Sequence, residues 1–328
     1  MRRGHPSHAK SWHRAAGLVL VPAVLGAFVF GATSCSTGSS TSTKTSHKVE
    51  RSAGCGRPAP LSAVPAGREQ DQTLHVGAVT GSYQLSVPGT YRAARPAPLI
   101  LLFYGFGSGP SQFSSLTGLP SRGSTAGYLV AVPRAQGAES EWQFNAHGSD
   151  AAFVDELVSS LENTYCIDRS SVFAAGFSAG AAFTIIYSCA RESRVAAVAT
   201  VAVEFQLGCT RPMSILAFHG TEDPLVPYQN GAVGLSLPGV KVRGTQRNMG
   251  DWARLDRCGT VPRRVRSGSQ VIHQQWYGCA RGTSVVLYTI VGGGHTWPGA
   301  DPRRAVGLTT QQVSATVGIL SFFSRVRR

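Results

Sequence analysis

The cysteines of this 328-residue chain are not spaced as metal ligands are. Zinc sites use pairs of cysteine or histidine a few residues apart, and no two of the seven cysteines stand so close together. The sequence also lacks a recognised nucleic-acid-binding motif and any internal repeat. These absences argue against a zinc protein, a nucleic-acid-binding protein and a chain divided into repeated units.

Acidic residues are few: 17 Asp and Glu stand against 31 Lys and Arg, which gives a net charge of +14. Four of the cations and none of the acids precede residue 35, so residues 35–328 carry +14 − 4 = +10. Such a charge favours acidic surfaces, for example anionic lipid headgroups or acidic wall polymers. The arginines are scattered over several segments, however, and scattered arginines are more often simply solvated surface.

The first 34 residues are typical of an export signal. Basic residues come first, an apolar stretch covers 18–32, and Cys35 follows small residues as in a bacterial lipoprotein cleavage site. Ala32 departs from the leucine-like residue usual there, and an uncleaved signal anchor is the alternative. We expect a signal peptide at 1–34, lipid modification of Cys35, a Ser/Thr-rich flexible linker at 35–54 and one domain at 55–328, exported and either held at the cell membrane or secreted.

Without Cys35, the number of cysteines is even, which fits an oxidising compartment. Six cysteines allow fifteen pairings. Proximity along the chain favours Cys258–Cys279 and Cys189–Cys209, which leaves Cys55 and Cys166 for each other.

Ser178 lies in the pentapeptide Gly176-Phe177-Ser178-Ala179-Gly180, between an apolar run at 171–175 and a helix-like run at 181–189. A strand, a sharp turn and a helix form a nucleophile elbow, which exposes a serine hydroxyl at the edge of a sheet. An ordinary glycine-bounded turn would give the same letters, but the flanking elements favour the elbow. Ser178 is therefore the predicted nucleophile.

An acid and a base should follow the serine in that order. Asp223 comes just after the buried run 214–218 and is the predicted acid, with its neighbour Glu222 as the rival. His295 follows a strand-like run and three glycines, on a loop from which an imidazole can reach both partners, and is the predicted base. His273 lies in an alternating strand instead, and His219 is expected to brace the loop that carries the acid.

The tetrahedral intermediate needs two backbone donors. Ala179 N–H follows the serine, and Phe106 N–H, in a glycine-rich loop after the apolar run 98–103, is the expected second donor. Trp297 is close to His295 and is a candidate for the substrate pocket. Trp142 is a second candidate, although a core position is equally compatible with its sequence. The chemistry requires no cofactor and no metal.

Strand-like runs alternate with helix-like runs from residue 98 onward, which predicts an α/β domain with a mostly parallel sheet and helices on both faces. The predicted strands cover 74–79, 83–87, 98–103, 128–132, 172–175, 195–203, 215–218 and 285–291, and the predicted helices 151–164, 181–190 and 310–326.

With these motifs in place, the chain resembles the secreted polyhydroxybutyrate depolymerase and feruloyl esterase branch of the α/β-hydrolases over nearly all of residues 72–325. The resemblance is carried by the elbow and by the segments 150–154, 165–168, 219–223, 226–228 and 294–299, whose Gly-His-Thr-Trp-Pro-Gly is similar to a hallmark of that family. It places the catalytic residues of the family on Ser178, Asp223 and His295. One position departs: Tyr104 stands where members usually have a histidine before the oxyanion loop.

The predicted function is an exported serine esterase that acts through an acyl-enzyme. The resemblance implies hydroxyalkanoate, aryl or feruloyl, or short-chain esters as substrates. A serine peptidase is the enzymatic alternative, because the same triad cleaves amides. A non-catalytic lipoprotein that binds lipid or glycan in the same cleft is the alternative of another class.

Overall fold

A computed structural model of the chain describes residues 49–58, 70–77, 79–137, 141–233 and 241–326. The predicted export signal, Cys35 and the linker as far as residue 48 lie outside the described residues. Within the described part, no helix is both long and apolar enough to cross a membrane. No three His, Cys, Asp or Glu side chains of this part gather into a group that could hold a metal ion.

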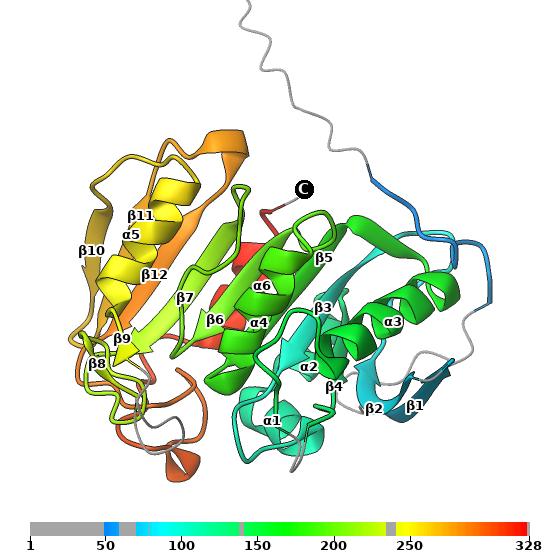
Figure 1. Ribbon diagram of the computed structural model, residues 1–328, viewed down its shortest axis with the longest axis horizontal. Helices are drawn as coiled ribbons and strands as arrows, with labels where there is room; N and C mark the ends of the chain where they lie inside the picture. Colours follow the sequence, from blue (N-terminus) through cyan, green and yellow to red (C-terminus); the bar gives the residue numbers. More distant parts are fainter. Residues whose placement is uncertain (1–48, 59–69, 78, 138–140, 234–240, 327–328) are drawn as a thin grey trace, which may run out of the picture. The chain divides into compact units, whose positions relative to one another are not determined.

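The domain is organised on one ten-stranded sheet, with strand order β1-β2-β4-β3-β5-β6-β7-β12-β11-β10 (Figure 1). The strands from β4 to β12 in that order run parallel, and antiparallel strands border them on both sides. Their bounds are β1 (Gln70–Val76), β2 (Val79–Ser86), β3 (Ala97–Phe103), β4 (Leu129–Pro133), β5 (Ile167–Phe177), β6 (Ala197–Val201), β7 (Ser214–Gly220), β10 (Arg263–Ser267), β11 (Val271–Trp276) and β12 (Val285–Ile290). The predicted mostly parallel α/β sheet is confirmed.

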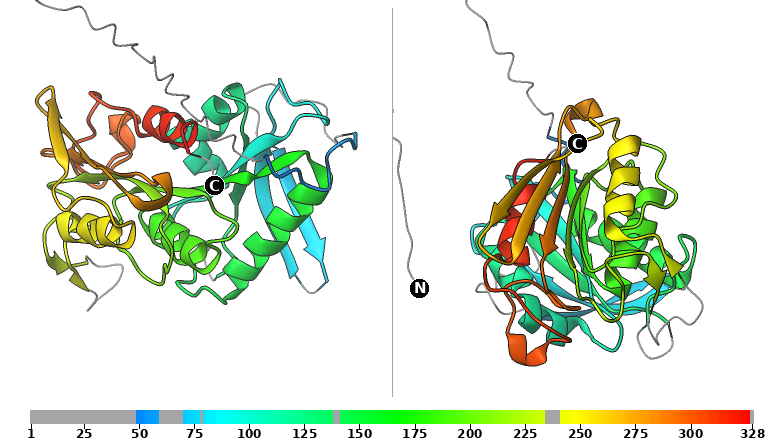
Figure 2. Two further views of the ribbon diagram at one scale, coloured as in Figure 1. Left: turned by 90° about the horizontal axis from the view of Figure 1, so that it is seen from above. Right: turned by 90° about the vertical axis from the view of Figure 1, so that its left-hand side faces the viewer.

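Helices cover both faces of the sheet (Figure 1 and Figure 2). One face carries α3 (Ser149–Thr164), α4 (Ala179–Ala190) and α5 (Thr245–Leu255), and the other carries α1 (Pro110–Thr117), α2 (Leu119–Thr125) and α6 (Ala315–Phe323). Short elements complete the described part: a small two-stranded sheet of β8 (Gly231–Ala232) and β9 (Lys241–Val242), and the 3-10 turns η2 (Ala280–Gly282) and η3 (Pro302–Arg304).

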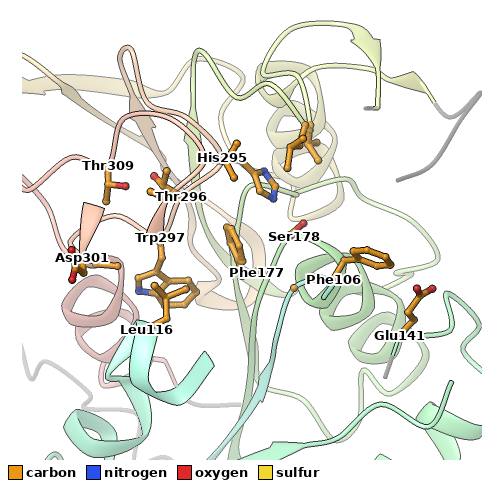
Figure 3. A pocket seen from close by; sticks show the side chains of 16 residues that line it. Phe106, Leu116, Glu141, Phe177, Ser178, His295, Thr296, Trp297, Asp301 and Thr309 are labelled. Carbon is orange, nitrogen blue, oxygen red and sulfur yellow. The ribbon is translucent and has the colours of Figure 1, made fainter. Parts of the chain in front are cut away.

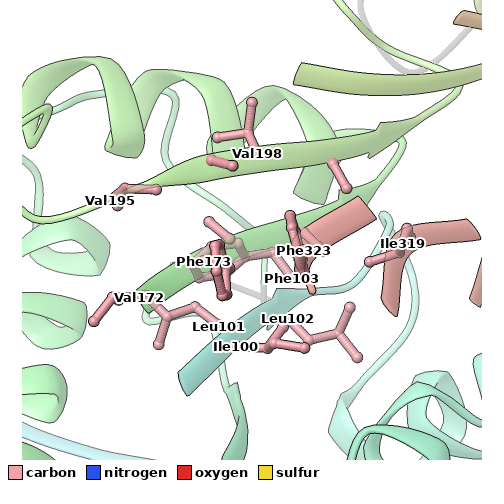
Figure 4. Packing of buried hydrophobic residues seen from close by; sticks show 14 of the residues in the cluster. Ile100, Leu101, Leu102, Phe103, Val172, Phe173, Val195, Val198, Ile319 and Phe323 are labelled. Atoms are coloured by element: carbon pink, nitrogen blue, oxygen red, sulfur yellow. The ribbon is translucent and has the colours of Figure 1, made fainter. Parts of the chain in front are cut away.

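The central strands are apolar because helices cover them from both sides. Strands β4, β6 and β7 are buried along their whole length, as expected for parallel strands between two helical layers. Figure 4 shows the core between the sheet and α6, where the rings of Phe173 and Phe323 stack with centroids 4.5 Å apart. This rigid layer fixes the positions of the loops at the carboxyl ends of the strands.

Several boundaries and elements differ from the sequence prediction. Helix α6 begins at Ala315 and not at residue 310, because the Ser314 side chain accepts a hydrogen bond from Val317 N–H and so caps the helix. Helices α1, α2 and α5 and strand β10 were not predicted. Strand β10 has no buried residue and carries three arginines, so it lacks the apolar alternation that reveals a strand.

The structure contains all three predicted disulfides: Cys189–Cys209 and Cys258–Cys279, which proximity along the chain favours, and Cys55–Cys166, the pair that these two leave. The Cys55–Cys166 bond fastens the segment before β1 to the beginning of β5.

The predicted linker end at residue 54 is too late. Ser52 Oγ donates to the Tyr165 carbonyl and accepts from Ile167 N–H, and Gly54 N–H donates to the Glu162 carbonyl. Backbone that satisfies its hydrogen bonds on the domain is part of the domain. The folded unit therefore includes residues 49–54.

Candidate active site

Ser178 lies at the sharp turn between β5 and α4. Its backbone has φ 54° and ψ −122°, a conformation that a non-glycine residue rarely adopts and that is typically found at functional sites. The turn needs glycine on both sides. A Cβ on Gly176 would stand 2.4 Å from the Gly180 carbonyl oxygen, and one on Gly180 would stand 2.2 Å from the Phe103 carbonyl oxygen. The predicted elbow geometry is therefore present, with the reason for both of its glycines.

Two loops at the carboxyl ends of neighbouring parallel strands are bound to each other beside the elbow. The loop after β7 and the loop after β12 share hydrogen bonds from Glu222 N–H to the Gly293 carbonyl and from Gly292 N–H to Thr221 Oγ1. Their backbones approach closely, because a Cβ on Gly220 would stand 2.2 Å from the Gly293 carbonyl oxygen. This close contact brings residues 72 positions apart in the sequence into one site.

The structure pairs Asp223 with His295. His295 Nδ1 and Asp223 Oδ2 are 2.7 Å apart, and both residues are buried. The other oxygen, Oδ1, accepts from Leu225 N–H and Val226 N–H, which fixes the carboxylate plane. With Nδ1 donating to the carboxylate, His295 Nε2 is left to accept a proton. Glu222, the rival acid, is exposed.

Ser178 and His295 line the same cleft, and Figure 3 shows the imidazole on the side of the serine hydroxyl. Among the described residues, no hydrogen bond joins Ser178 Oγ to His295. Such bonds are often long without substrate and tighten when it binds. The elements that carry Ser178, His295 and Asp223 thus place the three predicted residues in one cluster.

The two predicted oxyanion donors flank the serine. Phe106 and Gly105 line the cleft together with Ser178, and Ala179 is the first residue of α4. Within the described part of the chain, neither Phe106 N–H nor Ala179 N–H donates to a protein acceptor. An N–H in the first turn of a helix has no partner in that helix. Both amides are therefore available to a ligand oxygen at Ser178.

Trp142 does not lie in the cleft, so its prediction as a pocket residue was wrong. It is buried, and its indole Nε1–H donates to the Tyr104 carbonyl at 2.8 Å. The Tyr104 ring, also buried, packs on Trp142 with centroids 5.0 Å apart, and its hydroxyl accepts from Ala135 N–H. Trp142 and Tyr104 therefore pack together at the start of the loop that carries Phe106.

The cleft beside Ser178 has a volume of about 700 Å³ and a mainly apolar wall. Trp297 belongs to this wall, as predicted, and its indole N–H donates to Thr316 Oγ1 at 3.0 Å. Two carboxylates, Glu141 and Asp301, stand on the cleft's rim. The lining consists of Gly105, Phe106, Leu116, Glu141, Phe177, Ser178, Leu225, Val226, His295, Thr296, Trp297, Ala300, Asp301, Ala305, Val306 and Thr309 (Figure 3).

His219 braces the acid loop, as expected, but it does so with a partner that was missed. Its Nδ1 lies 2.6 Å from Glu204 Oε2, and its Nε2 lies 3.5 Å from Asp223 Oδ2. Glu204 follows β6 and could have been found, because an acid after a buried strand meets the neighbouring strand ends at the same edge.

The charges in this cluster stabilise one another. Burial alone would lower the pKa of His219, but the Glu204 and Asp223 carboxylates raise it to about 10. Burial alone would raise the pKa of Asp223, but hydrogen bonds from His219 and His295 hold it below its usual range. The pKa of Glu204 is likewise lowered, because the His219 charge outweighs the cost of burial.

His273 is not part of the site. It lies on β11, half-buried, with its ring 4.8 Å from the ring of Tyr288 on the next strand. This agrees with its prediction as an ordinary strand residue.

Comparison with known proteins gives similarity to esterases, although no family model matches the chain. The sequence is 28% identical over 257 residues to a probable feruloyl esterase C from Aspergillus terreus, an alignment that covers 75% of this chain and 84% of the fungal protein. It is also 28% identical over 269 residues to feruloyl esterase D from Neurospora crassa, covering 77% of this chain and 85% of that protein.

Among solved structures, the acetyl xylan esterase from Aspergillus awamori superposes with a TM-score of 0.54 at 15% identity, covering 79% of this chain and 99% of the esterase. At that identity the similarity shows the fold alone. The sheet order, the elbow and this similarity establish the α/β-hydrolase fold.

Proposed function

We propose that the protein is an exported serine esterase that hydrolyses carboxylic esters through an acyl-enzyme. His295 Nε2 takes the proton of Ser178 Oγ as that oxygen forms a bond to the ester carbonyl carbon. The carbonyl oxygen becomes an oxyanion and accepts from the amides of Phe106 and Ala179, each of which lowers the barrier by about 3 kcal/mol. The bond to the alcohol then breaks, and His295 returns its proton to the leaving oxygen.

Water completes the cycle. It gives a proton to His295 Nε2 and attacks the acyl carbon. When the second tetrahedral intermediate collapses, the bond to Ser178 Oγ breaks, His295 gives the proton to that oxygen, and the acid is released. Asp223 remains ionised throughout, holds His295 in the required tautomer and stabilises its protonated form. The residues of this chain supply every group that the reaction needs.

One observation carries the proposal: the serine with φ 54° shares a cleft with a buried His295–Asp223 pair whose nitrogen and oxygen are 2.7 Å apart. The similarity to two feruloyl esterases over three quarters of the chain supports the ester-hydrolase class independently.

The cleft supports an aryl ester as substrate. The rings of Phe106, Phe177 and Trp297 offer a surface for an aromatic or short acyl group. The rim carboxylate of Glu141 can accept hydrogen bonds from hydroxyl groups, which suits an alcohol portion that is a sugar. The Asp301 carboxylate already binds the Arg303 guanidinium. Feruloyl esters of polysaccharides fit both features better than a hydroxyalkanoate polymer, which carries neither an aromatic ring nor free hydroxyls along its chain.

The test is a substrate panel with wild type and Ser178→Ala. Methyl ferulate, p-nitrophenyl butyrate, acetylated xylan, a polyhydroxybutyrate film and a p-nitroanilide peptide distinguish the ester classes from one another and from amide cleavage. We expect hydrolysis of the two small esters by wild type and none by a Ser178→Ala protein with an unchanged circular dichroism spectrum. Amide cleavage without ester cleavage would favour the peptidase alternative. Reversible binding of the small esters without turnover would favour the non-catalytic alternative.

We further propose that the exported protein is lipid-anchored through Cys35. The three disulfides support an extracytoplasmic location, because such bonds persist where the environment is oxidising. Expression in a bacterial host with labelled palmitate should give incorporation into the wild-type protein and none into Cys35→Ser. Equal labelling of both proteins, or of neither, would contradict the anchor and leave the esterase proposal intact.

A further inference from the structure

His219 and Glu204 form a second buried charge pair behind Asp223 that the hydrolytic steps above do not use. Both residues are only 2% exposed. His219 is near the end of β7, and Glu204 follows β6, the strand beside it in the sheet. A buried charge pair costs desolvation energy and is weak evidence for stability on its own, so its place against Asp223 suggests another role.

The contacts of the His219 ring determine its protonation. Nε2 lies 2.9 Å from the Val226 carbonyl oxygen, which can only accept, so Nε2 must carry a proton. Nδ1 lies 2.6 Å from Glu204 Oε2. The other Glu204 oxygen accepts from Asn248 Nδ2 at 3.0 Å, and the Thr245 hydroxyl also donates to this carboxylate. The Thr245 hydroxyl also lies 2.9 Å from Nδ1, but the carboxylate oxygen is the nearer partner. With Glu204 ionised and held by these donors, Nδ1–H donates to Oε2, so both ring nitrogens carry a proton.

We propose that His219 is a permanently protonated positioning residue of the triad, with Glu204 as its counter-ion. The imidazolium contacts the Asp223 carboxylate and binds the carbonyl of Val226, whose own N–H donates to Asp223. It thus holds the acid and the backbone around it in one orientation. This proposal rests on the proposed function in that it takes Ser178, His295 and Asp223 as a working triad.

The net charge of the buried groups explains why His219 and Glu204 accompany Asp223 and His295. With His295 neutral, Asp223, His219 and Glu204 carry −1, +1 and −1, a net charge of −1. When His295 accepts the serine proton, the buried set becomes neutral. Without the imidazolium, two carboxylates would share a buried site, and one of them would tend to take up a proton. The other side chains against the ring, those of Thr245 and Tyr228, bring neither a carboxylate nor a cation to it.

The first experiment measures protonation and needs no substrate. In the disulfide-bonded protein labelled with ¹⁵N-histidine, the His219 signals, assigned by their loss in His219→Gln, should show both ring nitrogens protonated from pH 6 to pH 9. An imidazole at this position that titrates near its ordinary pKa of about 6.5 would overturn the proposal. Because no turnover is measured, this result stands even if the protein hydrolyses no ester.

The second experiment measures kinetics per active site, counted by fluorophosphonate titration. In Glu204→Gln, an amide of the same shape replaces the carboxylate, so His219 should lose its second proton at neutral pH and kcat should fall about 10- to 100-fold, with KM changed less than about threefold. His219→Gln should give a similar fall, and the double variant should be no worse than the single ones.

The matched control is His273→Gln, a histidine of the same sheet outside the site, which should keep wild-type kcat. If Glu204→Gln folds and retains wild-type kcat although His219 has lost its second proton at pH 8, the positioning role is wrong. If His219 stays doubly protonated in that variant, the counter-ion role of Glu204 is wrong. Should His219→Gln fail to fold, the kinetics of Glu204→Gln and the ¹⁵N-histidine spectrum of the wild type still test the proposal. A wild type without any esterase activity would contradict the proposed function and not the protonation of His219.

Discussion

The two sides of the cleft are held in place by different forces. On the side of His295, two loops are joined by backbone hydrogen bonds, and behind them lies the charged series Asp223, His219 and Glu204. On the oxyanion side, the loop rests on the uncharged pair Tyr104 and Trp142. The charged side should therefore respond to loss of a charge, and the aromatic side to loss of packing.

The largest expected effect comes from breaking the charged side at its centre. Asp223→Asn should lower kcat about 10⁴-fold, because the amide can hold His295 in the wrong tautomer and cannot stabilise its protonated form. The assay is hydrolysis of p-nitrophenyl butyrate with matched active-site titration. Glu222→Gln is the control one residue away, exposed and expected to be active. An inactive Glu222→Gln with a normal Asp223→Asn would show that the acid is misassigned.

A sharper comparison uses two disulfides that close loops of nearly equal length. Cys189–Cys209 spans 20 residues and encloses Glu204, whereas Cys258–Cys279 spans 21 and lies away from the cleft. Replacing either pair with serines should cost about 3 kcal/mol in the free energy of unfolding, since the loop-closure entropies are almost the same.

Only the Cys189–Cys209 variant should also lower kcat, because its loop carries the counter-ion of His219. Urea unfolding and kinetics on both variants provide the check. Equal kcat values in the two variants would show that the loop carrying Glu204 does not influence catalysis.

Asp256 contrasts with Asp223 and Glu204, because its buried carboxyl is paired with no cation among the residues that the structure describes. Its Oδ1 accepts from Met213 N–H, and the Thr283 hydroxyl also donates to this carboxyl. Burial raises its pKa to about 6. A raised pKa means that the folded state prefers the protonated form of Asp256. The stability that this preference contributes is fully present below the unfolded pKa of about 3.9, and it is lost as the pH rises through about 6.

Asp256→Asn should therefore increase the free energy of unfolding by about 2 kcal/mol at pH 8 and by little at pH 4. Thermal or urea unfolding at the two pH values measures this difference. A gain of the same size at both pH values would contradict the titration of Asp256.

The smallest effect is expected on the aromatic side. Trp142→Phe keeps an aromatic ring but removes the donor to the Tyr104 carbonyl, so stability should fall by about 1 kcal/mol and kcat by a few fold. The pH profile of kcat/KM should keep its shape, because no charge has changed. A shifted profile would show that the two sides of the cleft are not independent.

The sequence predicted those site residues that belong to short, recognisable motifs. The elbow glycines are required by close backbone contacts, and the residues after strands β7 and β12 meet because those strands are parallel neighbours. Trp142 could not be placed in the same way, since a loop tryptophan can point into a core or a cleft. Strand β10 was missed because its exposed residues show no apolar alternation. Glu204 was missed although its place after the buried strand β6 was a usable signal, and only its pairing with His219 depends on the folded chain.

The central claim, that Ser178 is an activated nucleophile, is tested most directly by mapping a fluorophosphonate adduct. The intact disulfide-bonded protein is incubated with the reagent, digested and examined by peptide mass spectrometry, with His295→Ala as the matched variant. We predict one adduct per chain, on Ser178, and labelling at least 100-fold slower in His295→Ala, because general-base assistance contributes about 10²–10⁴-fold. An unlabelled wild type, an adduct on another residue, or equal labelling rates in the two proteins would contradict the account.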